Sequence, residues 1–375
     1  MRKVLFLIHD LGQGGAEKVL VNLVNNMDDS KFDITVMTLF DVGVNRQFLN
    51  SNIKYQSCFS RVVPGNSHLM KLLTSNQLHR RYIKEKYDIE ISYLEGPSTR
   101  MISGCPWKDT KKIAWVHCTM KTQKDIACGY RSFKEAQECY RNLDLVAFVS
   151  KDIKNTFLKQ LPLECATKVV YNTNDSERIL TMSEEIPQSF ETGDGVINWC
   201  GVGKLTPNKG FDRMLYIQKR LIQEGYKTHL HIIGDGQEKE RLEEYCKQNN
   251  IRKSVTFWGY QTNPYKYIAN CDLFVCASHS EGFSTAATEA LIVGTPICTV
   301  EVSGMKELLG ANNEHGIVVE NNDEALYQGI KKMVGNGDLL NYYKERAKAR
   351  GKDFKTHNTV AAVEEMLVNL AEGKI

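Results

Sequence analysis

Short apolar runs alternate with segments of helical pattern along the whole chain. The runs lie at 4–8, 32–39, 89–94, 113–116, 145–149, 168–171, 196–200, 229–233, 255–258, 273–277 and 297–300. Apolar runs of about four to eight residues, bounded by polar turns, are typical of strands buried in a parallel sheet. Between the runs, as from Ala16 to Met27, apolar residues recur every three or four positions, which predicts helices. The alternation of strand and helix predicts an α/β fold.

The chain is long enough for two domains. It has 375 residues, of which 42% are apolar and 25% are charged, an ordinary composition for a globular protein. We predict a first domain over 1–182, a connector of low structure over 183–195 and a second domain over 196–353. The last segment, about 354–375, carries apolar residues at helical spacing from Val360 to Leu370 and is expected to form an amphipathic helix.

The most informative stretch begins where the run 273–277 ends. Ser284 or Thr285 is placed to cap a helix, Gly294 is placed to end it in the left-handed conformation, and the proline two residues later prevents its continuation. In doubly wound sheets, such a strand–loop–helix unit lies at the carboxyl edge of the strands, where ligands bind. The amides that precede this helix are therefore expected to form an anion site reinforced by the helix dipole.

Two carboxylates and two ammonium groups lie next to such loops. Glu281 is at the mouth of the turn, and Glu289 lies about one and a half turns into the helix, where a carboxylate can accept paired hydrogen bonds from a diol. Lys204 and Lys209 flank a glycine-bearing loop before the next predicted helix, so both ammonium groups can converge on phosphate oxygens. The alternative for each of these residues is a solvated side chain without a ligand.

Two further features belong to the first domain. His117 follows the run 113–116, so it is expected at the carboxyl edge of the sheet as a ligand contact; a structural histidine is the alternative. Gly14 and Gly15 lie in a glycine loop after the first run, but this loop does not match the dinucleotide fingerprint. Glu17, just after this loop, has two equally good explanations. It contacts a ligand, or it is a carboxylate in the first turn of the helix that the helix dipole favours.

The sequence Glu-Gly-Phe-Ser…Glu-Ala-Leu…Gly-Thr-Pro from Glu281 to Pro296 resembles the signature of the retaining glycosyltransferases of family 4. The resemblance spans essentially the whole chain and is most specific from Gly201 to Glu307. It implies the GT-B fold, in which two Rossmann-like domains face a cleft. It also implies that the C-terminal helix packs back on the first domain.

The resemblance also implies a role for each candidate residue. Gly14 and Gly15 are close-approach positions, His117 lies near the transferred sugar, and Lys204 and Lys209 bind the diphosphate, with Lys204 at a position where the family usually has Arg. Glu281 faces the hydroxyls of the donor sugar and Glu289 faces the ribose. The remaining substrate-binding positions are Gly282, Phe283, Ser284 and Thr285.

The expected activity is that of a hexosyltransferase. The donor is a nucleotide diphosphate sugar, in particular a UDP-sugar, and the acceptor is a glycan or lipid-linked glycan in bacterial cell-surface polysaccharide synthesis. Because the chain contains no Asp-x-Asp pair, we expect no metal and no cofactor, with basic side chains in place of the metal. Two alternatives are a sugar phosphorylase, which would carry pyridoxal phosphate on a lysine, and a non-catalytic nucleotide- or glycan-binding module.

The net charge of +3 does not suggest nucleic acid as a partner, but the charge is unevenly distributed. Between Arg61 and Lys134 there are 14 Lys and Arg against 6 Asp and Glu, with Leu69, Met70, Leu72, Leu73, Trp107 and Tyr130 among them. Such a mixture suits an anionic membrane surface. A solvated basic face is the alternative.

The cysteines and the apolar segments indicate the compartment. The 11 Cys are an odd number without a Cys-x-x-Cys pair, which is typical of reduced thiols in a cytosolic protein. The apolar run near the N-terminus stops at Ile8, and no stretch approaches the roughly 20 apolar residues that span a bilayer. We expect a cytoplasmic protein, bound peripherally to the inner face of the membrane where the basic segment contacts lipid.

Overall fold

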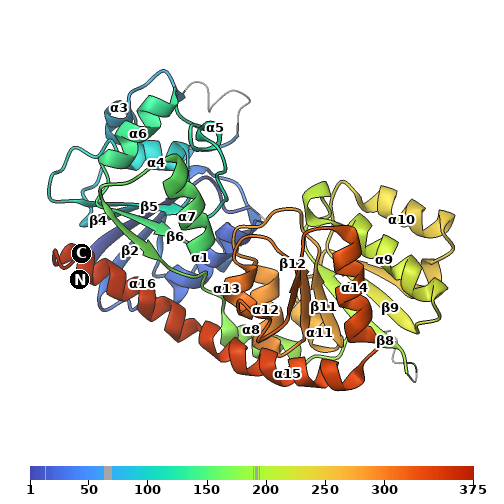
Figure 1. Cartoon of the computed structure of the whole chain (residues 1–375). Coiled ribbons are helices and arrows are strands. Elements are labelled where there is room, and N and C mark those ends of the chain that lie inside the picture. The colour runs from blue at the N-terminus through green and yellow to red at the C-terminus, as the bar shows by residue number, and fades with distance from the viewer. Residues whose placement is uncertain (13, 63–69, 189, 191–192, 194) are drawn as a thin grey trace. The chain divides into compact units, whose positions relative to one another are not determined.

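The computed structural model describes residues 1–12, 14–62, 70–188, 190, 193 and 195–375. These residues form two compact units, which Figure 1 shows. The N-terminal unit consists of Met1–Thr173 and Thr356–Ile375, and the C-terminal unit consists of Asn174–Lys355. The second unit begins earlier than the predicted connector, because helix α8 (Ser176–Ser183) packs against helices α11 (Tyr265–Ala269) and α12 (Thr285–Val293) of that unit.

The described residues of the N-terminal unit contain a sheet of seven parallel strands in the order β3-β2-β1-β4-β5-β6-β7. The strands are β1 (Arg2–Ile8), β2 (Phe32–Phe40), β3 (Lys54–Phe59), β4 (Ile89–Ser92), β5 (Lys111–Val116), β6 (Leu145–Phe148) and β7 (Ala166–Val169). Side chains from Val4 to Ile8 in β1 are fully buried, as expected for a central strand covered on both faces.

Helices connect these strands. They are α1 (Gly15–Asn26), η1 (Val44–Phe48), α3 (Ser75–Tyr82), α4 (Pro97–Ile102), α5 (Gln123–Ile126), α6 (Phe133–Arg141) and α7 (Lys151–Gln160). The unit is completed by α16 (Thr356–Ala371), which packs against α1 (Figure 1). Val363, Met366 and Leu367 of α16 are buried, and the Asp28 amide donates to the Glu364 carboxylate at 2.7 Å. The predicted C-terminal amphipathic helix is confirmed.

The described residues of the C-terminal unit contain a sheet of six parallel strands in the order β10-β9-β8-β11-β12-β13. Its strands are β8 (Ile197–Val202), β9 (Thr228–Ile233), β10 (Val255–Gly259), β11 (Leu273–Cys276), β12 (Ile297–Val300) and β13 (Ile317–Val319). Besides α8, α11 and α12, its helices are η2 (Pro207–Lys209), α9 (Phe211–Gln223), α10 (Lys239–Gln248), η3 (Arg252–Ser254), α13 (Met305–Leu309), α14 (Asp323–Val334), α15 (Gly337–Gly351) and η4 (Lys352–Phe354). Both sheets have the strand order of a doubly wound Rossmann-like domain, as predicted.

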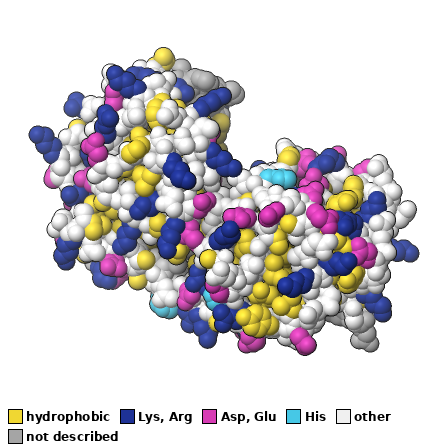
Figure 2. Space-filling view, in the orientation of Figure 1, with side chains coloured by type: hydrophobic (Ala, Val, Ile, Leu, Met, Phe, Trp, Pro, Cys, Tyr) yellow, Lys and Arg dark blue, Asp and Glu magenta, His cyan; other side chains and the backbone are white. Residues whose placement is uncertain are grey.

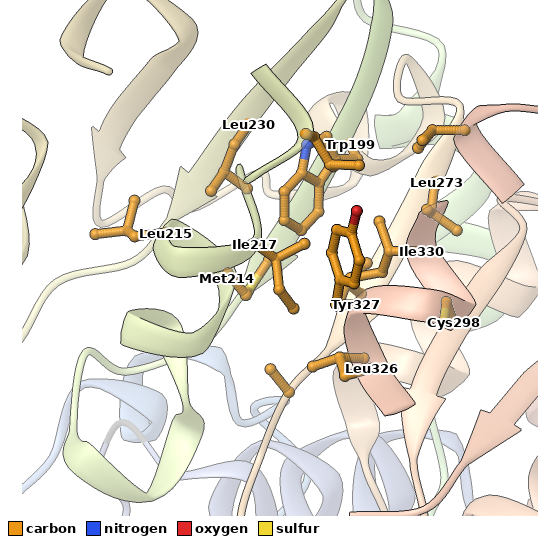
Figure 3. Packing of buried hydrophobic residues seen from close by; sticks show 14 of the residues in the cluster. Trp199, Met214, Leu215, Ile217, Leu230, Leu273, Cys298, Leu326, Tyr327 and Ile330 are labelled. Atoms are coloured by element: carbon orange, nitrogen blue, oxygen red, sulfur yellow. The ribbon is translucent and has the colours of Figure 1, made fainter. Parts of the chain in front are cut away.

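The core of the C-terminal unit is an apolar cluster that contacts the buried polar side chain of Gln218. Figure 3 shows Trp199 and Tyr327 among the aliphatic side chains of this cluster. The Trp199 indole N–H donates to Gln218 Oε1 at 2.9 Å, and Gln218 Nε2 donates to the Thr228 carbonyl at 3.0 Å. The buried indole N–H and the Gln218 side chain therefore both have hydrogen-bond partners inside the core.

All the predicted strands are present, and two strands were not predicted. β3 has the polar sequence Lys-Tyr-Gln-Ser-Cys-Phe and is only partly buried, because it is an edge strand of its sheet. β13 is three residues long, too short to produce a pattern. No helix in the part of the chain that the structure describes combines the length and the apolar character needed to cross a membrane.

Candidate functional site

The candidate site of the C-terminal unit lies where its strand order reverses. β8 and β11 are neighbours there, with Trp199 beside Leu273 and Cys200 beside Phe274. The glycine-bearing loop with Lys204 and Lys209 follows β8, and the loop with Glu281 follows β11, so both loops leave the same edge of the sheet. Crevices at such reversal points bind ligands in doubly wound folds.

The two loops are joined by hydrogen bonds. Asn208 accepts the His279 amide through its carbonyl at 2.8 Å, and its side-chain amide donates to the Ser280 carbonyl at 2.9 Å. The buried Arg213 of α9 donates from Nη1 to the Ala277 carbonyl at 3.0 Å. The backbone after β11 is therefore held by groups from two other elements, and side chains that start from it are well positioned.

Lys209 and Glu281 form an ion pair across the loops. The Lys209 ammonium lies 2.6 Å from Glu281 Oε1, and 11% of the Glu281 side chain is exposed. Burial by itself would lower the pKa of Lys209, but the Glu281 carboxylate outweighs this and raises the pKa above its ordinary value. The ammonium is therefore fully charged near neutral pH and lies next to a helix start, as a diphosphate site requires.

The backbone around Lys209 also requires glycine. Gly210 has φ +66°, and a Cβ at this position would lie 2.2 Å from the Ala277 carbonyl oxygen. A side chain there would separate the loops that carry Lys209 and Glu281. Lys204 has an exposed side chain and forms no ion pair with any residue that the structure describes. The structure thus brings one of the two predicted lysines to Glu281.

Helix α12 has the predicted ends. Ser284 is its N-cap and accepts the Ala287 amide through Oγ at 3.3 Å, and Thr285 is the first helical residue. Gly294 ends the helix with φ +81° in the left-handed conformation. The predictions from the local sequence are confirmed here, and the start of α12 follows the Glu281 loop directly.

Two residues of this motif are buried in the unit. Glu289 on α12 is 3% exposed, so it is not a solvated helix residue, which excludes that alternative for it.

Phe283 is 6% exposed, and its ring lies 6.1 Å from the ring of Phe354. Gly304 has φ +79°, and a Cβ there would lie 2.7 Å from Phe283 Cδ2. The Phe283 side chain therefore serves packing, which leaves its backbone and that of Gly282 for ligand contact.

His117 lies at the carboxyl edge of the other sheet, in the N-terminal unit. It is 8% exposed, its ring centroid lies 4.8 Å from that of Tyr93, and burial lowers its pKa to about 3. Its backbone N–H donates to Glu95 Oε2 at 3.1 Å. The imidazole Nε2 is buried without a hydrogen-bond partner among the described residues. A neutral imidazole with such an atom can bind a hydroxyl group.

Glu95 is a residue that the sequence prediction did not assign. It follows β4, which pairs with β5, and β5 is the strand that precedes His117. The available signal was its position directly after an apolar run, the same signal that identified His117. The Glu95 carboxylate reaches the His117 backbone because the strands that precede the two residues are neighbours in the sheet.

The glycine loop of the N-terminal unit ends at the start of α1. Gly14 is the N-cap and Gly15 the first helical residue. A Cβ at Gly14 would lie 2.0 Å from Glu17 Oε2, so the Glu17 carboxylate folds back over the helix start. Burial raises the pKa of Glu17, and the nearby Asp10 carboxylate adds to this. Gly14 thus lies against the Glu17 carboxylate, and Gly12 of the same loop donates its amide to Asp10 Oδ1 at 2.7 Å.

One cluster with three metal-ligand types of side chain occurs among the described residues, at His79, Glu90 and Cys105. His79 Nε2 lies 2.8 Å from Glu90 Oε2, and Cys105 Sγ lies 3.6 Å from Glu90 Oε1. His79 and Glu90 are fully buried, so a hydrogen-bonded pair that satisfies the buried carboxylate explains the contact.

Comparisons with known proteins identify relatives of this chain. A family model of group 1 glycosyl transferases matches residues 182–350. The chain is 27% identical over 368 residues to N-acetylgalactosamine-N,N'-diacetylbacillosaminyl-diphospho-undecaprenol 4-alpha-N-acetylgalactosaminyltransferase of Campylobacter jejuni, covering 94% of this chain and 96% of that protein. It is 26% identical to the lipopolysaccharide core biosynthesis glycosyltransferase LpsD of Rhizobium meliloti, covering 97% and 96%.

Solved structures share the fold. The complex of Anabaena HepE with UDP and glucose has a TM-score of 0.77 at 17% identity, covering 98% of this chain and 100% of HepE. WaaG, a glycosyltransferase of lipopolysaccharide biosynthesis, has a TM-score of 0.74 at 14% identity, covering 97% and 99%. Given the family match over most of the C-terminal unit, the full-length glycosyltransferase relatives and these structural neighbours, the protein is a glycosyltransferase with the GT-B fold.

Proposed function

We propose that the protein transfers a hexose, with retention of configuration, from a UDP-sugar to a lipid-linked glycan in bacterial cell-surface polysaccharide synthesis. The observation that carries the proposal is the Lys209–Glu281 pair at the reversal point of the second sheet, next to the start of α12. The diphospho-undecaprenol-linked substrate of the Campylobacter jejuni relative and the role of the Rhizobium meliloti relative in lipopolysaccharide core biosynthesis support the choice of acceptor. The UDP in the HepE complex supports the choice of nucleotide.

The departure of the nucleoside diphosphate is the difficult step. Negative charge develops on the leaving phosphate, so a fixed cation aimed at it lowers the barrier. The loop places the Lys209 ammonium beside this position, and the exposed Lys204 can turn from solvent towards the same oxygens. Glu281 and Glu289 orient the sugar and the ribose. We propose no glycosyl-enzyme, because these two carboxylates have different partners, and the leaving phosphate itself accepts the acceptor's proton.

We propose that no metal is required. The charges of the two lysines and the amides at the start of α12 take the place of a divalent cation on the diphosphate. Turnover is therefore expected to be unchanged in EDTA, measured as release of nucleoside diphosphate from the donor. A complete loss that added Mg²⁺ reversed would contradict the proposed site.

A screen of nucleotide sugars would identify the donor. A ligand at 100 times its Kd stabilises a protein by about 2.7 kcal/mol, which raises the Tm of a domain of this size by roughly 5–10 °C. UDP, GDP and ADP sugars would be compared by thermal shift, and positive donors tested for release of nucleoside diphosphate to a polyprenyl-diphosphate-linked acceptor. Binding without release would favour a binding module. Absorbance of pyridoxal phosphate in the purified protein would favour a phosphorylase.

We also propose that the basic segment of the N-terminal unit binds anionic lipid at the cytoplasmic face of the membrane. Figure 2 shows Lys and Arg side chains spread over the visible face of this unit with hydrophobic side chains between them. Some of the residues that the sequence analysis assigned to this basic segment are not at the surface in the structure. Arg100 is 1% exposed and its guanidinium lies 2.8 Å from Glu135, and Met70 and Tyr130 are buried; Leu69 lies outside the described residues.

The apolar side chain of Leu72 is exposed on this surface, on a backbone that hydrogen bonds hold. Leu72 is 76% exposed, and Arg131 donates to its carbonyl at 3.0 Å and to that of Lys71 at 2.5 Å. Flotation with anionic and neutral liposomes tests the proposal at low and high salt. Wild-type protein should float with anionic vesicles at low salt only, and the variant with Glu at Arg80, Arg81, Lys84 and Lys86 should not. Failure of the wild type to float at any salt concentration would favour a soluble acceptor.

A further inference from the structure

Three polar groups converge on one oxygen atom of the proposed site, Oε1 of Glu281. The Lys209 ammonium lies 2.6 Å from it, the Ser278 hydroxyl donates to it at 2.6 Å, and the Cys276 thiol lies 3.9 Å away. Ser278 and Cys276 are both buried. These contacts, one from a charged group and two from neutral groups, all reach the same oxygen of the Glu281 carboxylate.

These partners differ in their freedom to move. The Lys209 ammonium sits at the end of a flexible stem, and 32% of this side chain is exposed. Ser278 is 1% exposed and has a short side chain on a fixed backbone. Thr299 Oγ1 of β12 donates to the Cys276 carbonyl at 2.9 Å, and Arg213 holds the Ala277 carbonyl. The hydroxyl therefore stays in place when the ammonium turns away.

The Lys209 ammonium cannot bind the Glu281 carboxylate and a diphosphate equally well at the same time. When a nucleotide sugar binds as proposed above, the ammonium turns to the phosphate oxygens, and the carboxylate loses its charged partner. A carboxylate with one donor removed can rotate or bind water unless another donor holds it. The Cys276 thiol is too weak a donor for this purpose, and burial together with the Glu281 charge raises its pKa, so it stays neutral.

We infer that Ser278 is a positioning residue, whose hydroxyl holds Glu281 towards the hydroxyls of the donor sugar after Lys209 has turned to the diphosphate. The inference rests on the proposed function. It predicts that Ser278 contributes little to nucleotide binding, because the loop and the lysine remain in place without it. It contributes to turnover, because only the loaded site relies on it.

Steady-state kinetics of Ser278→Ala with the donor found in the screen would test this. A hydrogen bond to a charged group corresponds to a factor of roughly 10 to 100, so kcat is expected to fall by about tenfold or more. The KM for the donor and the Kd for the nucleoside diphosphate should change by less than about twofold. Ser278→Thr keeps the hydroxyl and should restore kcat. Ser280→Ala, at an exposed neighbouring side chain, is the matched control and should behave as wild type.

A second comparison separates positioning from general damage to the fold. If Ser278 acts through Glu281, then Ser278→Ala should cost less than about twofold in a Glu281→Ala background, since the acceptor of the Ser278 hydrogen bond is already absent. Full kcat in Ser278→Ala, or equal losses with and without Glu281, would overturn the inference. Were Glu281→Gln itself fully active, the proposed function would fail. If only Glu281→Gln lost activity, the proposed function would stand and the role of Ser278 would not.

Discussion

Lys209→Ala is the substitution that tests the proposed site most directly. Among the residues that the structure describes, the ammonium has one charged partner, Glu281, at 2.6 Å. Removing the ammonium leaves the Glu281 carboxylate bound to Ser278 and deprives a bound diphosphate of the cation on this loop. The fold should tolerate the change, because the backbone contacts between the loops do not use this side chain.

The size of the effect follows from the position of the ammonium. Two unit charges 4 Å apart interact by about 4 kcal/mol at an effective dielectric constant near 20. Since 32% of the Lys209 side chain is exposed, solvent screens part of this. Removal of a single preorganised charge stabiliser typically costs on the order of 10²- to 10³-fold in kcat. We therefore expect a loss of about 10²-fold in kcat, with a smaller loss of nucleotide affinity.

The assay is release of nucleoside diphosphate under saturating donor, together with calorimetric titration of the nucleotide and a thermal unfolding curve. Lys247→Ala is the matched control, since Lys247 is an exposed residue of α10 in the same unit whose side chain is 65% exposed. Wild-type kcat in Lys209→Ala would refute the assignment. A loss of activity that merely followed a large fall in Tm would refute the electrostatic explanation.

Further predictions concern the remaining site residues. Glu281→Gln should impair transfer while nucleotide binding is preserved, whereas Glu289→Ala should weaken nucleotide binding itself; equal losses of nucleotide affinity in calorimetry would contradict this division. Lys204→Arg should keep near wild-type turnover in the release assay, because the resembled family usually has Arg at this position. Burial lowers the pKa of His117 and of His231 to about 3, so the unfolded chain takes up these protons first as pH falls below about 6.5. Urea unfolding should show that the free energy of unfolding falls between pH 6.5 and 3 by about 1.4 kcal/mol per pH unit for each histidine. His117→Phe should remove the contribution of His117 to this pH dependence. An unchanged pH dependence in this variant would contradict the assignment.

Local signals predicted those parts of the fold that depend on neighbours in sequence. Ser284 and Gly294 mark the ends of α12 because capping uses side chains and conformations within one turn of the helix. The buried strands were visible because a parallel strand covered on both faces must be apolar throughout. β3 lacked this signal, since an edge strand exposes polar side chains.

Contacts between distant residues could not be predicted in this way. Phe283 stands in the motif that the sequence predicts to bind substrate, but its ring packs on Phe354, a residue from the end of the unit. A count of positive charges includes Arg100, although its guanidinium is buried against Glu135. The convergence of Ser278 and Lys209 on one oxygen likewise depends on the pairing of β8 with β11, which no local pattern contains.

The return of α16 to the N-terminal unit determines the order in which the chain can finish folding during synthesis. The C-terminal unit is a continuous segment, Asn174–Lys355, so it can fold as soon as that segment has left the ribosome. The N-terminal unit begins first but ends last, since Val363, Met366 and Leu367 of α16 are part of its buried core. Until the final residues emerge, the apolar side chains that α16 covers face solvent, although domains earlier in a chain usually fold first. A ribosome that stops before Thr356 therefore releases one finished domain and one that still exposes apolar surface.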